Sequence, residues 1–180
     1  MELKTTQAGD IPAFRRLYEK AFPKNEKFPF RALLKRFRKG NIEFLSIVDG
    51  GMFAGLMILA EDSGKALLNY FAIDEANRGK GYGSKALALL KERIGSRELF
   101  LDIELVMPGV PNAAQREKRK AFYLRNGFTE AGLRFKMFGD SFEMLSSGAA
   151  MDMDTLRAML GRIYGKPAEL IMKIVLKPLK

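Results

Sequence analysis

The sequence predicts one domain of the α+β class, built on a central mixed but mostly antiparallel sheet flanked by helices. Strand-like and helix-like apolar runs alternate along the 180 residues. Two strand-like runs flank Asp49-Gly50-Gly51, and Asp-Gly between apolar runs is a strong hairpin signal. One strand leads through a glycine-rich turn into a helix and a further strand, which is the β-α-β step of the series.

The first half of the chain contains two candidate helices and four candidate strands. Asp10 is a suitable N-cap for the first helix, and Pro12 lies where its missing N–H costs little. Apolar residues recur at helical spacing in the second helix, which Gly40 ends. The helices are expected at residues 11–21 and 28–38, and the strands at residues 1–7, 42–48, 52–59 and 65–73.

The second half alternates helices and strands again. Two prolines and a glycine make residues 107–112 a loop, and Asn126-Gly127 is a good C-cap for the helix after that loop. Helices are expected at residues 84–94, 113–125 and 154–164, and strands at residues 99–106, 128–138 and 141–145. The last two strands form a hairpin around Gly139-Asp140.

The domain is expected at residues 1–145, with residues 146–180 as a C-terminal extension packed on it. The extension carries a helix and an apolar segment at residues 170–176. The longest apolar run, residues 51–60, is about half a membrane span, so we expect no membrane crossing. The first residues lack the apolar core of a signal peptide, and we expect a cytoplasmic protein.

The composition excludes several kinds of chemistry. The chain has no cysteine and no histidine, which rules out a thiol nucleophile and removes the usual general base and metal ligand. The net charge is +10, and residues 15–40 hold ten Lys and Arg against two Glu. A second basic run spans residues 116–120. Such runs can bind a polyanion, but each alone is more often a solvated helix face.

The most informative segment is Arg78-Gly79-Lys80-Gly81-Tyr82-Gly83, between the strand at 65–73 and the helix at 84–94. Glycines at alternate positions let a ligand approach the main chain closely. The start of the helix adds unpaired N–H groups and the positive end of the helix dipole. With two cations alongside, the segment predicts a site for a phosphate or pyrophosphate group.

Two other phosphate motifs compete for this turn. The P-loop pattern fails because Gly83-Ser84-Lys85 has the wrong order. A dinucleotide fingerprint can be formed by Gly81, Gly83 and Ala86, with Asp102 beyond it. Polar residues 74–78 separate these glycines from the strand, however, and no further β-α-β units follow.

The same residues resemble the GNAT superfamily of acyl-CoA-dependent N-acetyltransferases. Residues 78–83 match its R/Q-x-x-G-x-G/A signature, and residues 71–74 and 84–90 resemble the strand and helix on either side. A second block, residues 121–128, resembles the family's Y-x-x-x-G-F motif. The order of elements over residues 1–145 also agrees, so this region is expected to be a GNAT-like acetyltransferase domain.

The resemblance implies that acetyl-CoA is the acyl donor, with no metal. Main-chain N–H groups of residues 79–84 would receive the pyrophosphate, and the main chain of the preceding strand would pair with the pantetheine arm. The cofactor-binding residues implied are Phe71, Ile73, Arg78, Gly79, Lys80, Gly81, Tyr82, Gly83 and Ser84.

Two catalytic residues are implied by the same resemblance. Tyr123 falls where the family often has a tyrosine that protonates the departing thiolate, and Glu104 lies where a glutamate sometimes deprotonates the ammonium through water. Asp102 would share the face of Glu104 by strand alternation. Arg116 and Arg119 depart from the family pattern, and can reach a CoA phosphate, an acidic substrate or only the surface.

The function expected is direct acetyl transfer to a primary amine of a small molecule or peptide in a ternary complex, by a monomer or homodimer. Without Cys or His, a covalent acyl-enzyme is not expected. One alternative is a basic nucleic-acid-binding or regulatory module that keeps the fold without catalysis, although nucleic acid is not the expected partner. Another is a nicotinamide-dependent oxidoreductase that uses the Gly81, Gly83 and Ala86 pattern.

Overall fold

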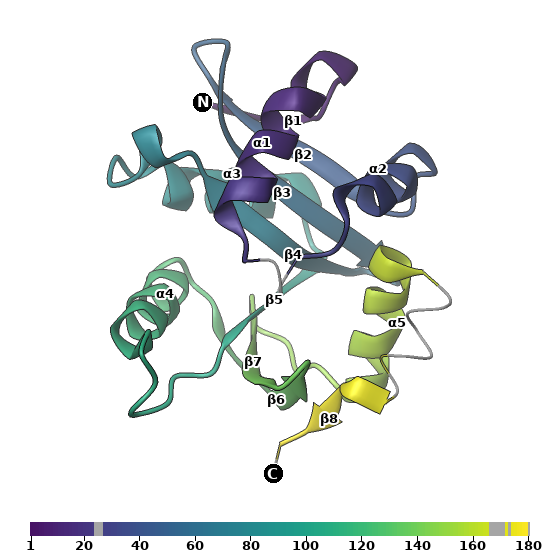
Figure 1. Ribbon diagram of the computed structural model, residues 1–180, viewed down its shortest axis with the longest axis vertical. Coiled ribbons are helices and arrows are strands. Elements are labelled where there is room, and N and C mark those ends of the chain that lie inside the picture. Colours follow the sequence, from purple (N-terminus) through teal and green to yellow (C-terminus); the bar gives the residue numbers. More distant parts are fainter. Residues whose placement is uncertain (24–26, 166–171, 173, 180) are drawn as a thin grey trace.

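The computed structural model describes residues 1–23, 27–165, 172 and 174–179. These residues form an α+β fold around an eight-stranded sheet with the strand order β1-β2-β3-β4-β5-β7-β6-β8 (Figure 1). The strands are β1 (Glu2–Thr5), β2 (Glu43–Asp49), β3 (Met52–Asp62), β4 (Lys65–Ile73), β5 (Glu98–Glu104), β6 (Thr129–Met137), β7 (Asp140–Ser146) and β8 (Lys177–Pro178). The α-helices are α1 (Ile11–Ala21), α2 (Phe30–Arg38), α3 (Tyr82–Ile94), α4 (Ala113–Arg125) and α5 (Met153–Tyr164), with 3-10 turns η1 (Ala8–Asp10) and η2 (Glu75–Asn77). The predicted fold class is confirmed.

Three tight hairpins set the register of the antiparallel strands. Each has a two-residue loop in which both residues have positive φ, as a type I′ turn requires. The loops are Gly50-Gly51 (56° and 81°), Ser63-Gly64 (47° and 80°) and Phe138-Gly139 (51° and 96°). Glycine adopts this conformation without steric cost, whereas the bulky Phe138 is strained there. The two hairpins expected around Asp49-Gly50-Gly51 and Gly139-Asp140 are confirmed.

The two faces of the sheet carry two separate hydrophobic cores. On one face, α1, α2 and α5 pack around a cluster that includes the stacked rings of Phe14 and Phe44, 4.6 Å apart. On the other face, α3 and α4 pack over side chains such as Leu68 and Leu101. Because side chains alternate along a strand, β4 directs Tyr70 to the first core and Phe71 to the second.

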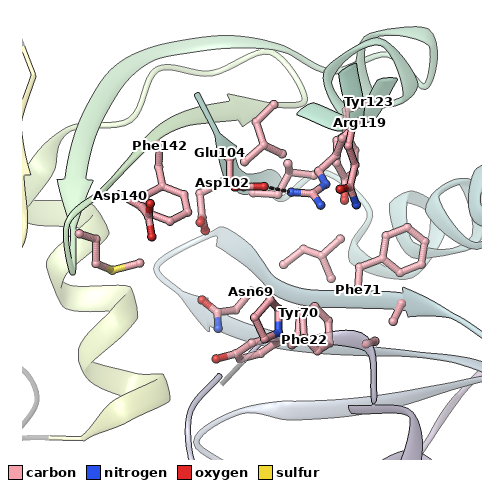
Figure 2. A pocket seen from close by; sticks show the side chains of 18 of the residues that line it. Phe22, Asn69, Tyr70, Phe71, Asp102, Glu104, Arg119, Tyr123, Asp140 and Phe142 are labelled. Atoms are coloured by element: carbon pink, nitrogen blue, oxygen red, sulfur yellow. Dashed lines mark hydrogen bonds and ion pairs between the residues drawn. The ribbon is translucent and has the colours of Figure 1, made fainter. Parts of the chain in front are cut away.

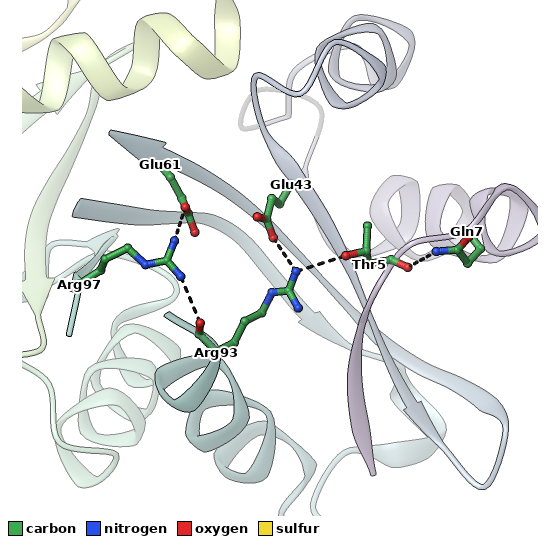
Figure 3. A network of polar contacts seen from close by, with 6 residues as sticks. All are labelled: Thr5, Gln7, Glu43, Glu61, Arg93 and Arg97. Atoms are coloured by element: carbon green, nitrogen blue, oxygen red, sulfur yellow. Dashed lines mark hydrogen bonds and ion pairs between the residues drawn. The ribbon is translucent and has the colours of Figure 1, made fainter. Parts of the chain in front are cut away.

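Helix α3 is tied to the sheet by polar contacts at its C-terminal end. Arg93 donates from Nη2 to Glu43 and to Thr5, both at 3.2 Å, and so reaches β2 and β1. Arg97 pairs with Glu61 of β3 and donates to the Arg93 carbonyl (Figure 3). These bonds orient α3 across three strands, and its N-terminus then lies at the carboxyl end of β4.

Strands β4 and β5 separate after a short parallel contact. They pair only at Lys65–Glu98, Ala66–Leu99 and Leu67–Phe100. Beyond Leu67, β4 stays paired with β3 and β5 with β7, so the two halves of the sheet diverge. The sheet therefore opens between the carboxyl ends of two neighbouring strands, which is where ligands usually bind in such sheets.

The C-terminal helix contributes to the first core. Leu156, Met159, Leu160 and Ile163 of α5 are buried there, and β8 pairs with β6 at Phe135–Pro178 and Lys136–Lys177. Most of the apolar segment expected at residues 170–176 lies within the described residues, but 170, 171 and 173 lie outside them. Treating residues 146–180 as an extension of a domain at 1–145 stays a prediction. None of the helices in the described part of the chain is long and apolar enough to span a membrane.

Candidate active site

The opening between β4 and β5 holds a cavity of about 490 Å³. Its walls come from both strands, from α4 and from the β6–β7 hairpin, with further side chains from the end of α1 and from α5 (Figure 2). Of the residues implied by the resemblance, Phe71, Ile73, Arg78, Glu104 and Tyr123 line this cavity. The fold thus brings together residues that lie up to 52 positions apart in the sequence.

The glycine turn ends at the N-terminus of α3. Gly79 and Gly81 have φ of 75° and 79°, and Gly81 is the N-cap residue. The Lys85 amide bonds to the Gly81 carbonyl at 3.1 Å as the first helical hydrogen bond, so the amides before it have no partner within the helix. A Cβ built on Gly79 or Gly81 meets nothing within 4 Å, which leaves the main chain open to a ligand.

Gly83 has a different role from the other two glycines. A Cβ built there would lie 3.0 Å from Cζ of Phe122 and 3.9 Å from Cζ of Phe71. The absence of a side chain at Gly83 therefore allows the Phe122 ring of α4 to approach α3. This contact sets the distance between the glycine turn and the helix that carries Tyr123.

The side chains of the turn divide between ligand-facing and structural positions. Lys80 and Ser84 are exposed beside the open amides. Arg78 lines the cavity and donates from Nε to the Ile73 carbonyl at 3.2 Å, which ties the turn to the end of β4. Tyr82 instead donates its hydroxyl proton to Asp49 of β2 and so anchors the first turn of α3.

Tyr123 reaches the cavity from the last turns of α4. Its ring packs edge-on against Phe122 at 5.1 Å and Phe128 at 5.7 Å. Burial raises the pKa of Tyr123 to about 12, although the charge of Arg119 lowers it in part. No hydrogen bond joins its hydroxyl to another group in the described part of the chain. Tyr123 therefore stays protonated at neutral pH, with a hydroxyl available to a ligand.

The Asn126-Gly127-Phe128 segment holds α4 in place. Lys91 of α3 donates to the carbonyls of Asn126 and Gly127 at 2.7 and 3.3 Å, and its ammonium lies 4.6 Å from the centre of the Phe128 ring. These contacts satisfy carbonyls at the C-terminal end of α4. They give a physical reason for this sequence pattern after the tyrosine.

Glu104 lies at the end of β5 and is surrounded by donors. Arg116 and Arg119 approach its two oxygens at 2.8 and 2.7 Å, and Asn112 donates at 3.0 Å. Burial alone would raise the pKa of Glu104, but the Asn112 hydrogen bond and the two arginines outweigh it and lower the pKa. The contacts hold Glu104 in its ionised form and tie α4 to the end of β5.

The two arginines that depart from the family pattern are thus explained by Glu104. Arg116 is buried, and it also donates to Asn112 Oδ1 at 2.8 Å and to the Leu105 carbonyl at 2.9 Å. Lys120 of the same basic run pairs with Glu130 and Glu143. Three of the cations at residues 116–120 are therefore neutralised by carboxylates of the fold, so this run is not a free anion-binding surface.

Sequence reasoning missed one side of the cavity. Asn69 of β4 donates to the Tyr164 hydroxyl of α5 at 3.1 Å, and both line the cavity. Asp140 and Phe142 of β7 line it beside Asp102 of the neighbouring strand β5 (Figure 2). The strand order brings β7 beside β5, and nothing in the local sequence near residue 140 indicates that neighbour. In the described part of the chain, no group of acidic side chains could hold a metal ion.

Comparisons with known proteins agree with this geometry. The family model of the GNAT acetyltransferase domain matches residues 40–130, which is half of the chain, and the chain belongs to this family. No curated protein matches the sequence. The glycine turn and both strands of the opening lie within the matched region.

Solved structures share the fold at low identity. An acetyltransferase from the GNAT family of Bacteroides thetaiotaomicron superposes with a TM-score of 0.71 at 21% identity, over 92% of this chain and 99% of that one. The ribosomal-protein-S18-alanine N-acetyltransferase from Escherichia coli gives 0.62 at 20%, over 83% and 94%. An aminoglycoside 6′-N-acetyltransferase complexed with coenzyme A gives 0.63 at 12%, over 84% and 100%. These likenesses concern the fold.

Proposed function

We propose that this protein is an N-acetyltransferase that transfers an acetyl group from acetyl-CoA to the primary amine of a small molecule or peptide. The observation that carries the proposal is the arrangement around one cavity. The opening between β4 and β5 is lined by Arg78, where the glycine turn begins, and by Tyr123. Membership of the GNAT family and a structural neighbour complexed with coenzyme A support it.

The residues present fit the donor. The open amides at the start of α3 and the positive φ of Gly79 and Gly81 provide a cradle for a diphosphate, and Lys80 adds positive charge. Because β5 leaves β4 after Leu67, the main chain of β4 at Phe71 and Ile73 is available to an extended ligand. When bound, acetyl-CoA would supply an acetyl group activated as a thioester.

The transfer must move two protons. The nitrogen forms a bond to the acetyl carbon while the carbon–sulfur bond breaks. The ammonium loses two protons on the way to the amide, of which one ends on the thiol and one in solvent. The chain has no cysteine or histidine, so the acetyl group passes directly to the amine in a ternary complex.

Tyr123 is the residue that we assign to the leaving thiolate. A hydroxyl can stabilise the developing charge on sulfur or give it a proton. With its pKa raised to about 12, Tyr123 carries that proton over the whole neutral range. Glu104 was predicted as the base, and its lowered pKa and three donors favour a positioning role instead.

Release of free thiol from acetyl-CoA in the presence of a panel of amines tests the proposal. We expect thiol release that depends on both the protein and an amine, with the acetylated amine detected by mass spectrometry. Thermal stabilisation by acetyl-CoA but not by NAD would separate this function from the oxidoreductase. Binding of DNA that weakens steeply with salt, without any thiol release, would favour the nucleic-acid-binding module.

A further inference from the structure

Charge is unevenly distributed around the cavity. Arg78 and Arg119 are the cations among the described residues that line it, and both lie with Tyr123 on the side that would receive the donor. Asp102 and Asp140 lie on the other side, where they point into the cavity from β5 and β7 (Figure 2). A chain with a net charge of +10 therefore places two carboxylates where an acceptor would lie.

Aromatic rings accompany these carboxylates. Phe142 is buried at the cavity wall and stacks on Phe135 at 5.7 Å, and Phe22 forms the opposite wall. Phe138 lines the cavity from the tip of the β6–β7 hairpin with 61% of its surface exposed. Ring faces attract ammonium groups, so rings and carboxylates favour the same kind of ligand.

Of the two carboxylates, Asp102 lies nearer to Tyr123, between that tyrosine and Asp140 (Figure 2). Burial is the main cause of the raised pKa of Tyr123, and the charge of Asp102 adds to it. Burial and Tyr70 raise the pKa of Tyr164, and Asp102 adds to this shift too. The Asp102 carboxylate thus raises the pKa of two tyrosines that line the cavity, one on α4 and one on α5. An ionised carboxylate offers about four acceptor positions, so it can accept from an amine and from the protein together.

We propose that the acceptor is a small amine with two cationic centres, whose reacting nitrogen is held by Asp102 and whose second ammonium is held by Asp140. This inference rests on the proposed function, since it assigns the substrate class of the same cavity. Asp102 keeps the reacting nitrogen beside the donor side of the cavity, where Tyr123 lies. An anionic acceptor would be repelled by both carboxylates, and a monoamine would leave Asp140 without its partner.

The first test compares amines that differ in one charge. Putrescine, butylamine and glutamate are titrated by calorimetry into the protein saturated with coenzyme A, and each is then tried in the thiol-release assay. We expect putrescine to bind and react best, with kcat/KM about tenfold or more above butylamine, and glutamate to be inert. Equal values for putrescine and butylamine, or a preference for a neutral peptide with an N-terminal alanine, would overturn the inference.

Substitutions assign the two charges. Asp140→Asn should lower kcat/KM for putrescine by about tenfold and leave butylamine nearly unchanged, because only the diamine reaches it. Asp102→Asn should impair both amines. Glu92→Gln, which removes an exposed carboxylate of α3 outside the cavity, is the matched control and should change neither. Equal losses for both amines in Asp140→Asn would show that Asp140 does not select a second ammonium.

Failure of this inference is distinguishable from failure of the proposed function. If acetyl-CoA binds and a monoamine is acetylated as well as the diamine, the transferase stands and the acceptor class is wrong. If putrescine binds through Asp102 and Asp140 but no thiol appears with any amine, the diamine-binding site stands and the transferase assignment falls. If putrescine does not bind at all, the acceptor class is wrong in either case.

Discussion

Arg119 donates to the carboxylate of Glu104 over 2.7 Å, and this ion pair joins the helix that carries Tyr123 to the strand that carries Asp102. Arg119 and Tyr123 lie one turn apart on α4, so movement of the arginine would move the tyrosine. Arg116 binds the other oxygen of the same carboxylate. The ion pairs of Arg116 and Arg119 with Glu104 therefore help to fix the position of the Tyr123 hydroxyl in the cavity.

Tyr123→Phe should lower kcat by roughly 100-fold or more, which is the usual range for loss of a general acid. The affinity for acetyl-CoA should stay nearly unchanged, because the open amides at the start of α3, and not this hydroxyl, are proposed to hold the diphosphate. Single-turnover kinetics and calorimetry separate the two quantities. Turnover equal to that of the wild type would remove Tyr123 from the chemistry.

Glu104→Ala should destabilise the fold by roughly 3–5 kcal/mol, because Arg116 would be left buried without its counter-ion. Glu104→Gln keeps the size of the side chain and should cost less. Urea unfolding measures both. An unchanged free energy of unfolding in both variants would contradict the anchoring role, and loss of turnover in a Glu104→Gln variant that remains folded would instead support Glu104 as the base.

The pH dependence of stability follows from the sign of the same pKa shift. The pKa of Glu104 is lower in the folded state than in the unfolded state, so the folded protein binds this proton less readily. The stability that this carboxylate contributes is present above its unfolded pKa and is lost as the pH falls through its folded pKa. Stability measured from pH 7 to pH 2 should therefore fall less steeply in Glu104→Gln. If stability fell equally steeply with pH in the wild type and in Glu104→Gln, the lowered pKa of Glu104 would be contradicted.

Gly83→Ala should destabilise the protein by roughly 1–3 kcal/mol, because the new methyl group would meet the Phe122 ring at 3.0 Å. Alanine is a better helix former than glycine, so a loss of stability would show that crowding against Phe122 outweighs the gain in helix propensity. Gly9→Ala is the matched control, since nothing lies within 4 Å of its added methyl group. A more stable Gly83→Ala variant would show that α4 can move away from the added methyl group without loss of free energy.

Phe138→Asn should raise the free energy of unfolding by about 1 kcal/mol, since asparagine accepts the positive φ of 51° far better than phenylalanine. The ring is mostly exposed, so little burial is lost. The affinity for putrescine should fall at the same time, because the ring lines the acceptor side of the cavity. A less stable variant with unchanged affinity would show that the ring packs on the protein rather than on a ligand.

The sequence was sufficient for the parts of the site whose residues are neighbours in the chain. The glycine spacing predicted the start of α3, and the helix begins at Tyr82, two residues before the expected position, because Gly81 supplies the left-handed N-cap. The strand expected at 99–106 ends at Glu104, since the chain enters the proline-containing loop soon after the Leu105 amide makes a last hydrogen bond, at 2.8 Å, to the Ser141 carbonyl of β7.

The acceptor side could not be predicted because it is assembled by long-range contacts. Asn69 and Tyr164 are 95 positions apart and meet through a bulge in β4 opposite Ile58–Leu59. The burial of Arg116 could not be predicted either, because a run of cations on a helix does not show which of them contacts a carboxylate from another element. Strand register and helix orientation determine both the Asn69–Tyr164 contact and the burial of Arg116.

The proposed function depends on binding of the coenzyme A diphosphate by the open amides around Gly79 and Gly81, and calorimetry with coenzyme A on matched glycine variants measures that binding. Gly81→Val should abolish binding, whereas Gly40→Val should keep it, although both glycines have positive φ (79° and 69°) and open surroundings. Backbone strain is then similar in the two variants, and only the first fills the cradle. Binding of coenzyme A to folded Gly81→Val with unchanged affinity would show that the glycine turn does not bind the diphosphate.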